Sequence, residues 1–352
     1  MTLRPMPAHK TPTPRRAPET GGGGTAHRPV MLDRVLDRLA PRPGGVYVDG
    51  TYGGGGYSDA ILESAGGVVV HAFDRDPAAI ARAESTAAAR DGRLVPHHAR
   101  FGTMDTVLRA AGVPGVDGVC LDLGLSWDQL IDAERGFSFR ADGPLDMRMD
   151  GTDAGGPTAA DLVNTATEKD LADILYRYGE ERRARRVARA IARERPIHGA
   201  HALAGLVRRV VPRARDGIDP ATRTFQALRI WVNDEVGELR RGLAAAERIL
   251  EPGGHLAVVS FHSLEDRTVK GFLRRRAGQG PRASRHSPAA VAGNNGTARA
   301  ASFRLLSRRP EQPDDDAVAA NPATRSARLR AAERTDAPAW PEDEPDAEGG
   351  RP

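Results

Sequence analysis

Short apolar runs alternate with helical stretches along the first third of the chain. The continuous apolar runs fall at residues 46–48, 68–73, 94–97 and 116–121. Between them lie a glycine-rich turn, a helical stretch through Ile61 and Leu62, and a helix that Pro77 opens at its favoured first position. Strands that alternate with helices in this way predict an α/β fold with a parallel sheet covered on both faces.

Helical periodicity also surrounds and interrupts this pattern. Leu32, Val35, Leu36 and Leu39 have the spacing of an amphipathic helix that ends before Pro41. Residues 128–222 are helical in pattern and contain no convincing strand, whereas a helical stretch at 236–250 precedes one more buried-type strand at 255–261. The sheet therefore resumes after an inserted helical subdomain. Because ligands bind at the strand ends of open α/β sheets, we expect the insert to lie over the ligand crevice.

Composition narrows the class of protein. The 352 residues correspond to about two domains, or to one large core with an insertion. No apolar run approaches the ~18 residues of a membrane span, and the first two dozen residues lack the apolar core of a secretory signal. The single cysteine, Cys120, excludes a disulfide framework, and no Cys/His cluster has zinc spacing. We therefore expect a cytoplasmic protein with no membrane partner.

Three segments lack periodicity and are rich in proline, glycine or small residues. Residues 1–24 and 335–352 are predicted to be disordered tails, and a third such segment lies near 278–300. No internal repeat is visible.

The basic residues are informative by position rather than by number. Basic and acidic residues number 51 and 47, a net charge of +4, and only Lys10, Lys169 and Lys270 are lysines. This bias reflects base composition, so arginine abundance alone does not indicate nucleic-acid binding. Residues 177–215, however, hold 12 arginines against three glutamates. One face of this part of the insert can therefore meet phosphate, the alternative being a solvated basic helix.

A glycine-rich segment, residues 49–57, follows the first strand and opens a helix. Its glycines let a ligand approach the backbone, and a helix N-terminus offers free N–H donors, although an exposed flexible turn is the alternative. Asp74 ends the second strand, where a carboxylate accepts hydrogen bonds from ribose, or acts as a simple helix cap. A dinucleotide fingerprint fails because Ser58 replaces its third glycine. S-adenosylmethionine is therefore favoured over a nicotinamide dinucleotide.

Polar segments punctuated by glycine and proline follow the fourth strand. They comprise residues 122–126, Gln129, residues 134–139 and residues 142–150. Such segments favour a functional loop over a spacer.

With these residues the chain resembles the ribosomal RNA small subunit methyltransferase H family over about residues 26–335. The matching blocks are His27-Arg28-Pro29-Val30, Asp49-Gly50-Thr51, Asp74-Arg75-Asp76-Pro77, Asp122-Leu123-Gly124, and residues 133–149, 178–182, 221–233 and 260–267. The resemblance implies a Rossmann-like, adenosylmethionine-dependent sheet at 25–127 and 223–334, with a substrate-recognition insert at 128–222. It also implies methylation of the exocyclic N4 of a cytidine in the decoding region of 16S rRNA, with the small ribosomal subunit as partner.

The resemblance further implies the cofactor contacts. They are Gly55, Gly56, Tyr57, Asp74, Phe101, Asp122 and Gln129. Two positions depart from the family pattern: Tyr57 stands where many members have histidine, and Trp127 where many have serine.

The proton acceptor is harder to predict. The lone pair of a cytosine amine is delocalised, so an acceptor on its N–H must help to localise that pair. The motif that many amino-methyltransferases place after the fourth strand, with two prolines and an aromatic residue, is absent from residues 122–125. Our candidates are Asp146, Ser260 and His262. The alternatives are an Asp146–Arg148 salt bridge and a structural histidine. No metal is expected, because transfer from a sulfonium needs no Lewis acid.

Two other functions stay open on the residues alone. A nicotinamide-dependent oxidoreductase would use the same sheet, and a noncatalytic RNA-binding or assembly factor would keep the basic insert. The sequence leaves open whether the chain forms a homo-oligomer.

Overall fold

The computed structural model describes residues 29–213, 217–279 and 299–341. Seven strands form one sheet in the order β3-β2-β1-β4-β5-β7-β6. Their bounds are β1 Val46–Asp49, β2 Val69–Asp74, β3 Leu94–His98, β4 Val116–Asp122, β5 Leu250–Ser260, β6 Phe303–Leu305 and β7 Arg328–Arg334. β1 to β5 pair in parallel, whereas β7 runs antiparallel to β5 and β6. The predicted α/β fold is confirmed, and each of the five apolar runs lies in a strand.

The sequence pattern does not predict β6 and β7. β6 has three residues, and β7 consists of arginine, alanine, leucine and glutamate, which favour helices in isolation. β7 is extended because it pairs with β5 from Ser260 back to His255. Strand pairing therefore overrides local propensity at this edge of the sheet.

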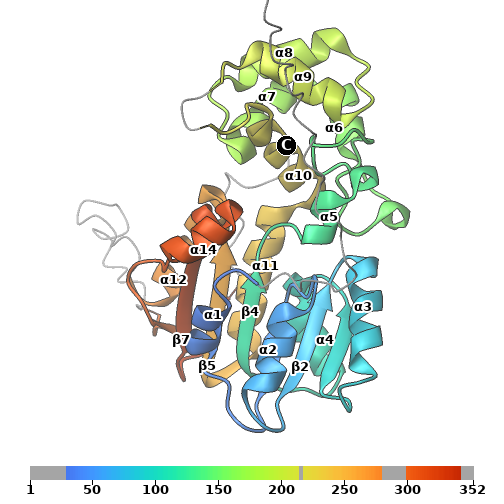
Figure 1. Ribbon diagram of the computed structural model, residues 1–352. Coiled ribbons are helices and arrows are strands. Elements are labelled where there is room, and N and C mark those ends of the chain that lie inside the picture. The colour runs from blue at the N-terminus through green and yellow to red at the C-terminus, as the bar shows by residue number, and fades with distance from the viewer. Residues whose placement is uncertain (1–28, 214–216, 280–298, 342–352) are drawn as a thin grey trace, which may run out of the picture.

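Helices cover both faces of the sheet, as predicted (Figure 1). One face carries α1 Leu32–Leu39, α2 Gly56–Ser64 and α3 Pro77–Ala87, and the other carries α4 Met104–Ala110, α11 Glu235–Ile249 and α12 Ser263–Arg276. Each set packs its apolar side chains against the strands in a separate buried cluster. None of the described helices is long and apolar enough to cross a membrane.

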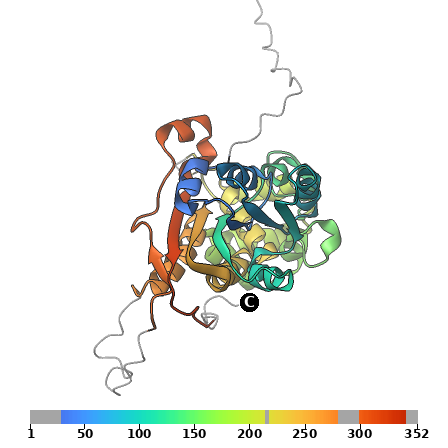
Figure 2. The same ribbon diagram turned by 90° about the horizontal axis from the view of Figure 1, so that it is seen from below.

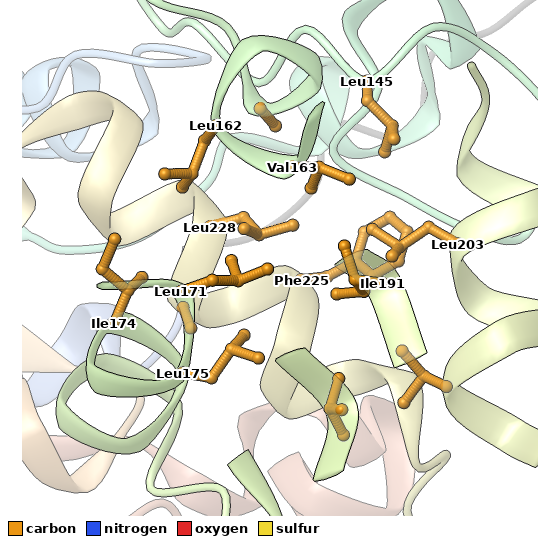
Figure 3. Packing of buried hydrophobic residues seen from close by; sticks show 14 of the residues in the cluster. Leu145, Leu162, Val163, Leu171, Ile174, Leu175, Ile191, Leu203, Phe225 and Leu228 are labelled. Carbon is orange, nitrogen blue, oxygen red and sulfur yellow. The ribbon is translucent and has the colours of Figure 1, made fainter. Parts of the chain in front are cut away.

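Five helices form a lobe of their own, which we call the helical lobe (residues 159–233): α6 Ala159–Thr165, α7 Glu168–Gly179, α8 Ala184–Glu194, α9 Ala200–Val210 and α10 Ala221–Asn233. The segment that leads into it contains α5 Trp127–Ile131 and short 3₁₀ turns at Ala133–Arg135 and Thr152–Ala154. Figure 1 shows the lobe at one end of the sheet, and Figure 3 shows its core. Phe225, Leu228 and Val232 of α10 belong to that core.

The segment before α14 (Asp315–Ala320) packs against α1 near the start of the described chain. Figure 2 shows α1 beside α14, and Arg38 Nε donates to Glu311 Oε1 at 2.6 Å just before that helix. The prediction of a disordered tail from residue 335 is wrong for residues 335–341. There the Trp340 indole donates to Ala300 O at 2.9 Å and its ring packs against Arg276. The predicted tail at 1–24, the rest of the C-terminal tail and most of 278–300 lie outside the described residues.

Candidate active site

Three carboxylates end three neighbouring strands. Asp74 ends β2, Asp49 ends β1 and Asp122 ends β4. The chain proceeds from β1 outward to β2 and β3 and then crosses to β4, so the strand order reverses between β1 and β4. Ligand crevices of open α/β sheets form at such a point. The structure therefore brings two predicted cofactor residues, Asp74 and Asp122, to the expected edge of the sheet.

Asp49 is a site residue that the sequence reasoning did not single out. It is fully buried, its Oδ2 accepts from Ser58 Oγ at 2.7 Å, and its Oδ1 accepts from Thr51 N at 3.1 Å. Burial raises its pKa to about 6. Asp49 thus holds the start of the glycine loop and the first turn of α2 together. Its place in the Asp49-Gly50-Thr51 block was the available signal.

The glycines of the loop have different roles. Gly53 (φ +52°) donates its N–H to Asp74 Oδ2 at 2.8 Å. A Cβ on Gly55 would lie 2.7 Å from the Tyr52 hydroxyl oxygen, and one on Gly56 would lie 2.4 Å from a Pro29 carbon. Gly54 alone of these has no such neighbour within 4 Å. Protein therefore already fills the space at Gly55 and Gly56, and the open approach to the backbone is at Gly54.

Tyr57 is buried in the core beneath the loop. Its hydroxyl donates to Val30 O, and burial raises its pKa well above the ordinary tyrosine value. In this conformation Tyr57 can offer a ligand its backbone but not its hydroxyl.

Asp74 and Asp76 divide two tasks between them. Asp76 caps α3 by accepting from Ala78 N at 3.0 Å, so the cap that was the alternative role for Asp74 belongs to Asp76. The Asp74 oxygens accept one backbone N–H each, from Gly53 and from Asp76. Burial raises the pKa of Asp74. Each carboxylate oxygen accepts more than one hydrogen bond, so Asp74 retains acceptor capacity for hydroxyl groups.

Gln129 and Phe101 both pack against protein. Gln129 Nε2 donates to Asp76 Oδ2 at 2.8 Å, and its Oε1 accepts from Ser126 N at 3.1 Å. Gln129 therefore holds α5 against the start of α3. Phe101 begins a 3₁₀ turn after β3, and its ring lies against Gly242 of α11, where a Cβ would come within 2.2 Å of Phe101 Cδ2.

Asp122 differs from the other two carboxylates. Its Oδ1 is buried, and no described residue donates a hydrogen bond to that oxygen. Its backbone N–H donates to Thr51 Oγ1 at 2.7 Å, which fixes the residue at the strand end. Burial, followed by the charges of Asp49 and Glu265, raises the pKa of Asp122 well above the usual range. An unpaired buried carboxylate is costly, which marks Asp122 as a candidate for binding a ligand.

Each of the three predicted proton acceptors makes a hydrogen bond within the protein; in His262 Nδ1 makes it, and the buried Nε2 makes none. Asp146 binds Arg148 with both oxygens, at 2.9 and 2.6 Å, and accepts from the Arg148 backbone N–H. Ser260 is buried and donates to Arg328 O at 3.3 Å. His262 caps α12 by accepting from Glu265 N through Nδ1. The structure shows both alternatives that the sequence left open. Asp146 forms a salt bridge with Arg148, and His262 is a structural histidine at a helix cap.

One group with the spacing of metal ligands occurs among the residues that the structure describes. Glu235, His262 and Glu265 have ligand-type atoms within 4.8 Å of one another. His262 Nε2 lies 3.1 Å from Glu265 Oε1 without the alignment of a hydrogen bond. Arg229 donates to both oxygens of Glu235, at 2.7 and 2.8 Å. The Arg229 guanidinium is therefore the ion-pair partner of Glu235 in this group.

The loop before the helical lobe is tied to the strand ends. Arg135 donates to Asp76 Oδ2 at 3.0 Å and to the backbone oxygens of Arg148 and Met149. Asn233 accepts from Met149 N at 2.8 Å and donates to Met147 O at 2.7 Å. These bonds hold residues 133–150 between the strand ends and the helical lobe.

Comparison with known proteins adds the context for this geometry. The sequence matches the MraW methylase family over residues 24–335. It is 58% identical over 317 residues to the ribosomal RNA small subunit methyltransferase H of Paramagnetospirillum magneticum. The alignment covers 89% of this chain and 97% of that relative. A protein of the same name from Rhodospirillum centenum is 56% identical over 316 residues, 89% of this chain and 93% of its own.

Solved structures are more distant. An rRNA methylase from Streptococcus thermophilus matches 89% of this chain and 100% of its own, with 11% identity and a TM-score of 0.37. TrmN from Thermus thermophilus matches 86% and 48% of the two chains, with 12% identity and a TM-score of 0.37. Because these TM-scores are low, the assignment of the chain to this family rests on the sequence similarity and on the order of the strands in the sheet.

Proposed function

The chain belongs to the MraW methylase family, and from that membership we propose that it methylates the exocyclic N4 of a cytidine in the decoding region of 16S rRNA. The methyl donor is S-adenosylmethionine, and the partner is the small ribosomal subunit, after which the relatives are named. The observation that carries the proposal is the sheet edge where Asp74 and the unpaired Asp122 lie at the reversal of strand order.

The residues at this edge fit S-adenosylmethionine. Asp74 has acceptor capacity for the ribose hydroxyls, and the loop is open at Gly54 for the amino-acid part. Asp122 offers a carboxylate without a protein partner to a positively charged ligand. We assign the remaining contacts to the backbone of Gly55, Gly56 and Tyr57, to Phe101 and to Gln129. When bound, the cofactor supplies an electrophilic methyl group, so the protein mainly has to align the amine with it.

The helical lobe offers a surface for RNA. Ala184, Val187, Ala188 and Ile191 form the predicted apolar stripe of α8 and are buried in the lobe core. The arginines of this helix lie on its exposed side, and Arg189 pairs with Glu168 at 3.2 Å. Arg182, Arg185 and Arg186 form no ion pair with any residue in the described ranges. Such arginines are suited to phosphate, which is the sequence-independent part of RNA binding.

A direct test measures the product. Small subunits from a strain that lacks this gene are incubated with the purified protein and S-adenosylmethionine, and the rRNA is digested for mass spectrometry. We expect one N4-methylcytidine to appear at a single position, and the base must be unstacked to react. A different methylated nucleoside would refute the N4 assignment. Absence of any transfer would instead favour the noncatalytic assembly factor. A ribosomal substrate also agrees with the expected cytoplasmic location.

A further inference from the structure

The proposed reaction needs a proton acceptor that the three sequence candidates do not supply. This inference rests on the proposed function, in which the nucleophile is a cytosine amine. Its N–H must donate to an acceptor as the lone pair forms the new bond. Asp146, Ser260 and His262 are occupied by Arg148, by Arg328 O and by the cap of α12. Asp146 and Ser260 would have to break these contacts, and the acceptor nitrogen of a neutral His262 is Nδ1, which the cap of α12 uses.

Asp122 is the carboxylate at the same edge that has no such contact. Its Oδ1 is buried and receives no hydrogen bond from the described residues. The two residues that follow Asp122 contact the end of β5. Leu123 N donates to Val259 O at 3.0 Å, and a Cβ on Gly124 would lie 3.6 Å from the Phe261 ring. The residue therefore stands between the glycine loop, which contacts it through Thr51, and the end of β5. We propose that the Asp122 carboxylate accepts the proton that leaves the cytidine N4.

The surroundings of Asp122 make it a weak acid. The groups that act on it electrostatically are Asp49 of β1, Glu265 of α12, Tyr57 of α2 and its strand neighbour Cys120. All of these are acids. Burial, with the charges of Asp49 and Glu265, raises the pKa of Asp122 well above the usual range. A carboxylate with a raised pKa is a better proton acceptor, and the positive charge of the bound sulfonium keeps it ionised until transfer.

The step balances in atoms and charge. The N4 lone pair forms the N–C bond to the methyl group, the C–S bond breaks, and its electron pair stays on sulfur as a neutral thioether. The surplus N4 proton passes to the Asp122 carboxylate. A cation and an anion are thereby converted into two neutral groups, which suits a site as poorly solvated as this one. The carboxylic acid then loses its proton to water after the products leave.

The test is Asp122→Asn, which keeps shape and one acceptor oxygen but cannot take a proton. Two readouts are compared: the single-turnover rate with small subunits at saturating cofactor, and the affinities for S-adenosylmethionine and S-adenosylhomocysteine by calorimetry. We expect the rate to fall about a hundredfold or more. Affinity should fall about tenfold for the charged cofactor and stay unchanged for the neutral product. The rate of the wild type should rise with pH, and the residual rate of the variant should not.

Asp128→Asn is the matched control, because Asp128 is an exposed residue of the nearby α5 that pairs with Arg82. It should leave both readouts within twofold of the wild type. A saturated rate for Asp122→Asn within tenfold of the wild type would overturn the inference. So would an equal loss of affinity for both ligands with transfer intact, which would make Asp122 a cofactor ligand only. Failure of the wild type to methylate small subunits would instead count against the proposed function.

Discussion

Arg75 and Asp150 form a two-point ion pair that joins the sheet to the segment leading into the helical lobe. Arg75 Nε lies 2.5 Å from Asp150 Oδ1, and its Nη2 lies 2.7 Å from Oδ2. Arg75 directly follows Asp74, and its Nη1 also donates to Asn233 O at the end of α10. Arg100 donates to the same carboxylate at 2.5 Å. The contact therefore fixes the lobe against the strand that carries the proposed ribose ligand.

Removing this carboxylate should weaken the junction. We expect Asp150→Asn to lower the free energy of unfolding by about 2 kcal/mol, because the mostly buried Arg75 loses one of its two hydrogen bonds and the charged acceptor of the other. Urea unfolding measures the change. Asp128→Asn, which removes an exposed pair with Arg82, should change stability by less than about 1 kcal/mol. Equal effects of the two substitutions would show that the Asp150 pair contributes no more than a surface pair.

Cofactor affinity should depend on Asp74. We expect Asp74→Ala to weaken S-adenosylmethionine binding about ten- to a hundredfold, because it removes the acceptors for the ribose and also frees Gly53 N–H. Calorimetric titration of the folded variant measures this loss. Glu84→Ala, on the exposed side of α3, is the control and should bind normally. Unchanged affinity in Asp74→Ala would reject the ribose assignment.

RNA binding should depend on the arginines of α8. Each phosphate contact contributes ~0.7 to 0.9 to the slope of log affinity against log salt, so Arg185→Gln with Arg186→Gln should flatten that slope by about one to two. Binding to small subunits is measured over a salt series. Arg304→Gln, on β6 at the far edge of the sheet, should leave the slope unchanged, and all variants should bind the cofactor normally. An unaltered slope in the double variant would mean that α8 is only a solvated basic helix.

The titration of Asp49 should lower the free energy of unfolding as pH rises from about 4 through about 6. Burial raises its pKa from 3.8 to about 6, so the folded state binds a proton more tightly than the unfolded state. The resulting stabilisation is complete below about pH 4 and is lost as pH rises through about 6, a contribution of about 3 kcal/mol. Asp49→Asn should remove this downward slope in urea unfolding measured from about pH 4 to about 7. Parallel curves for variant and wild type would contradict the shift.

The titration of His71 should change the free energy of unfolding in the opposite direction over a similar pH range. It is buried beside His97, with Nδ1 and Nε2 2.9 Å apart, and burial lowers its pKa to about 4. The unfolded state therefore binds the extra proton first, and stability is lost as pH falls from about 6.5 to about 4. We expect His71→Gln to remove an upward slope, so the two variants should deviate from the wild type in opposite directions. Deviations of the same sign would exclude this pair of assignments.

The sequence by itself determined the parallel part of the sheet, strands β1 to β5, and the edge at which we propose that the ligand binds. Continuous apolar runs bounded by turns are a local property, and the carboxyl ends of parallel strands meet at one edge whatever the side chains are. Asp74 and Asp122 could therefore be placed together from their positions alone. The apolar stripe of α8 followed from helical spacing in the same way.

Only the tertiary structure decided which polar side chains are already engaged. Asp146, His262 and Gln129 have the chemistry of site residues, but Arg148, the turn at Glu265 and Asp76 occupy them. β7 is a similar case, because its residues favour helices in isolation and the sequence pattern does not predict a strand there. Trp340 is another, because only the structure shows that its ring packs against Arg276. The physical reason is that hydrogen bonds and burial are pairwise across distant segments, whereas periodicity is local. A sequence thus shows which groups can react, and their partners in space decide which one is free.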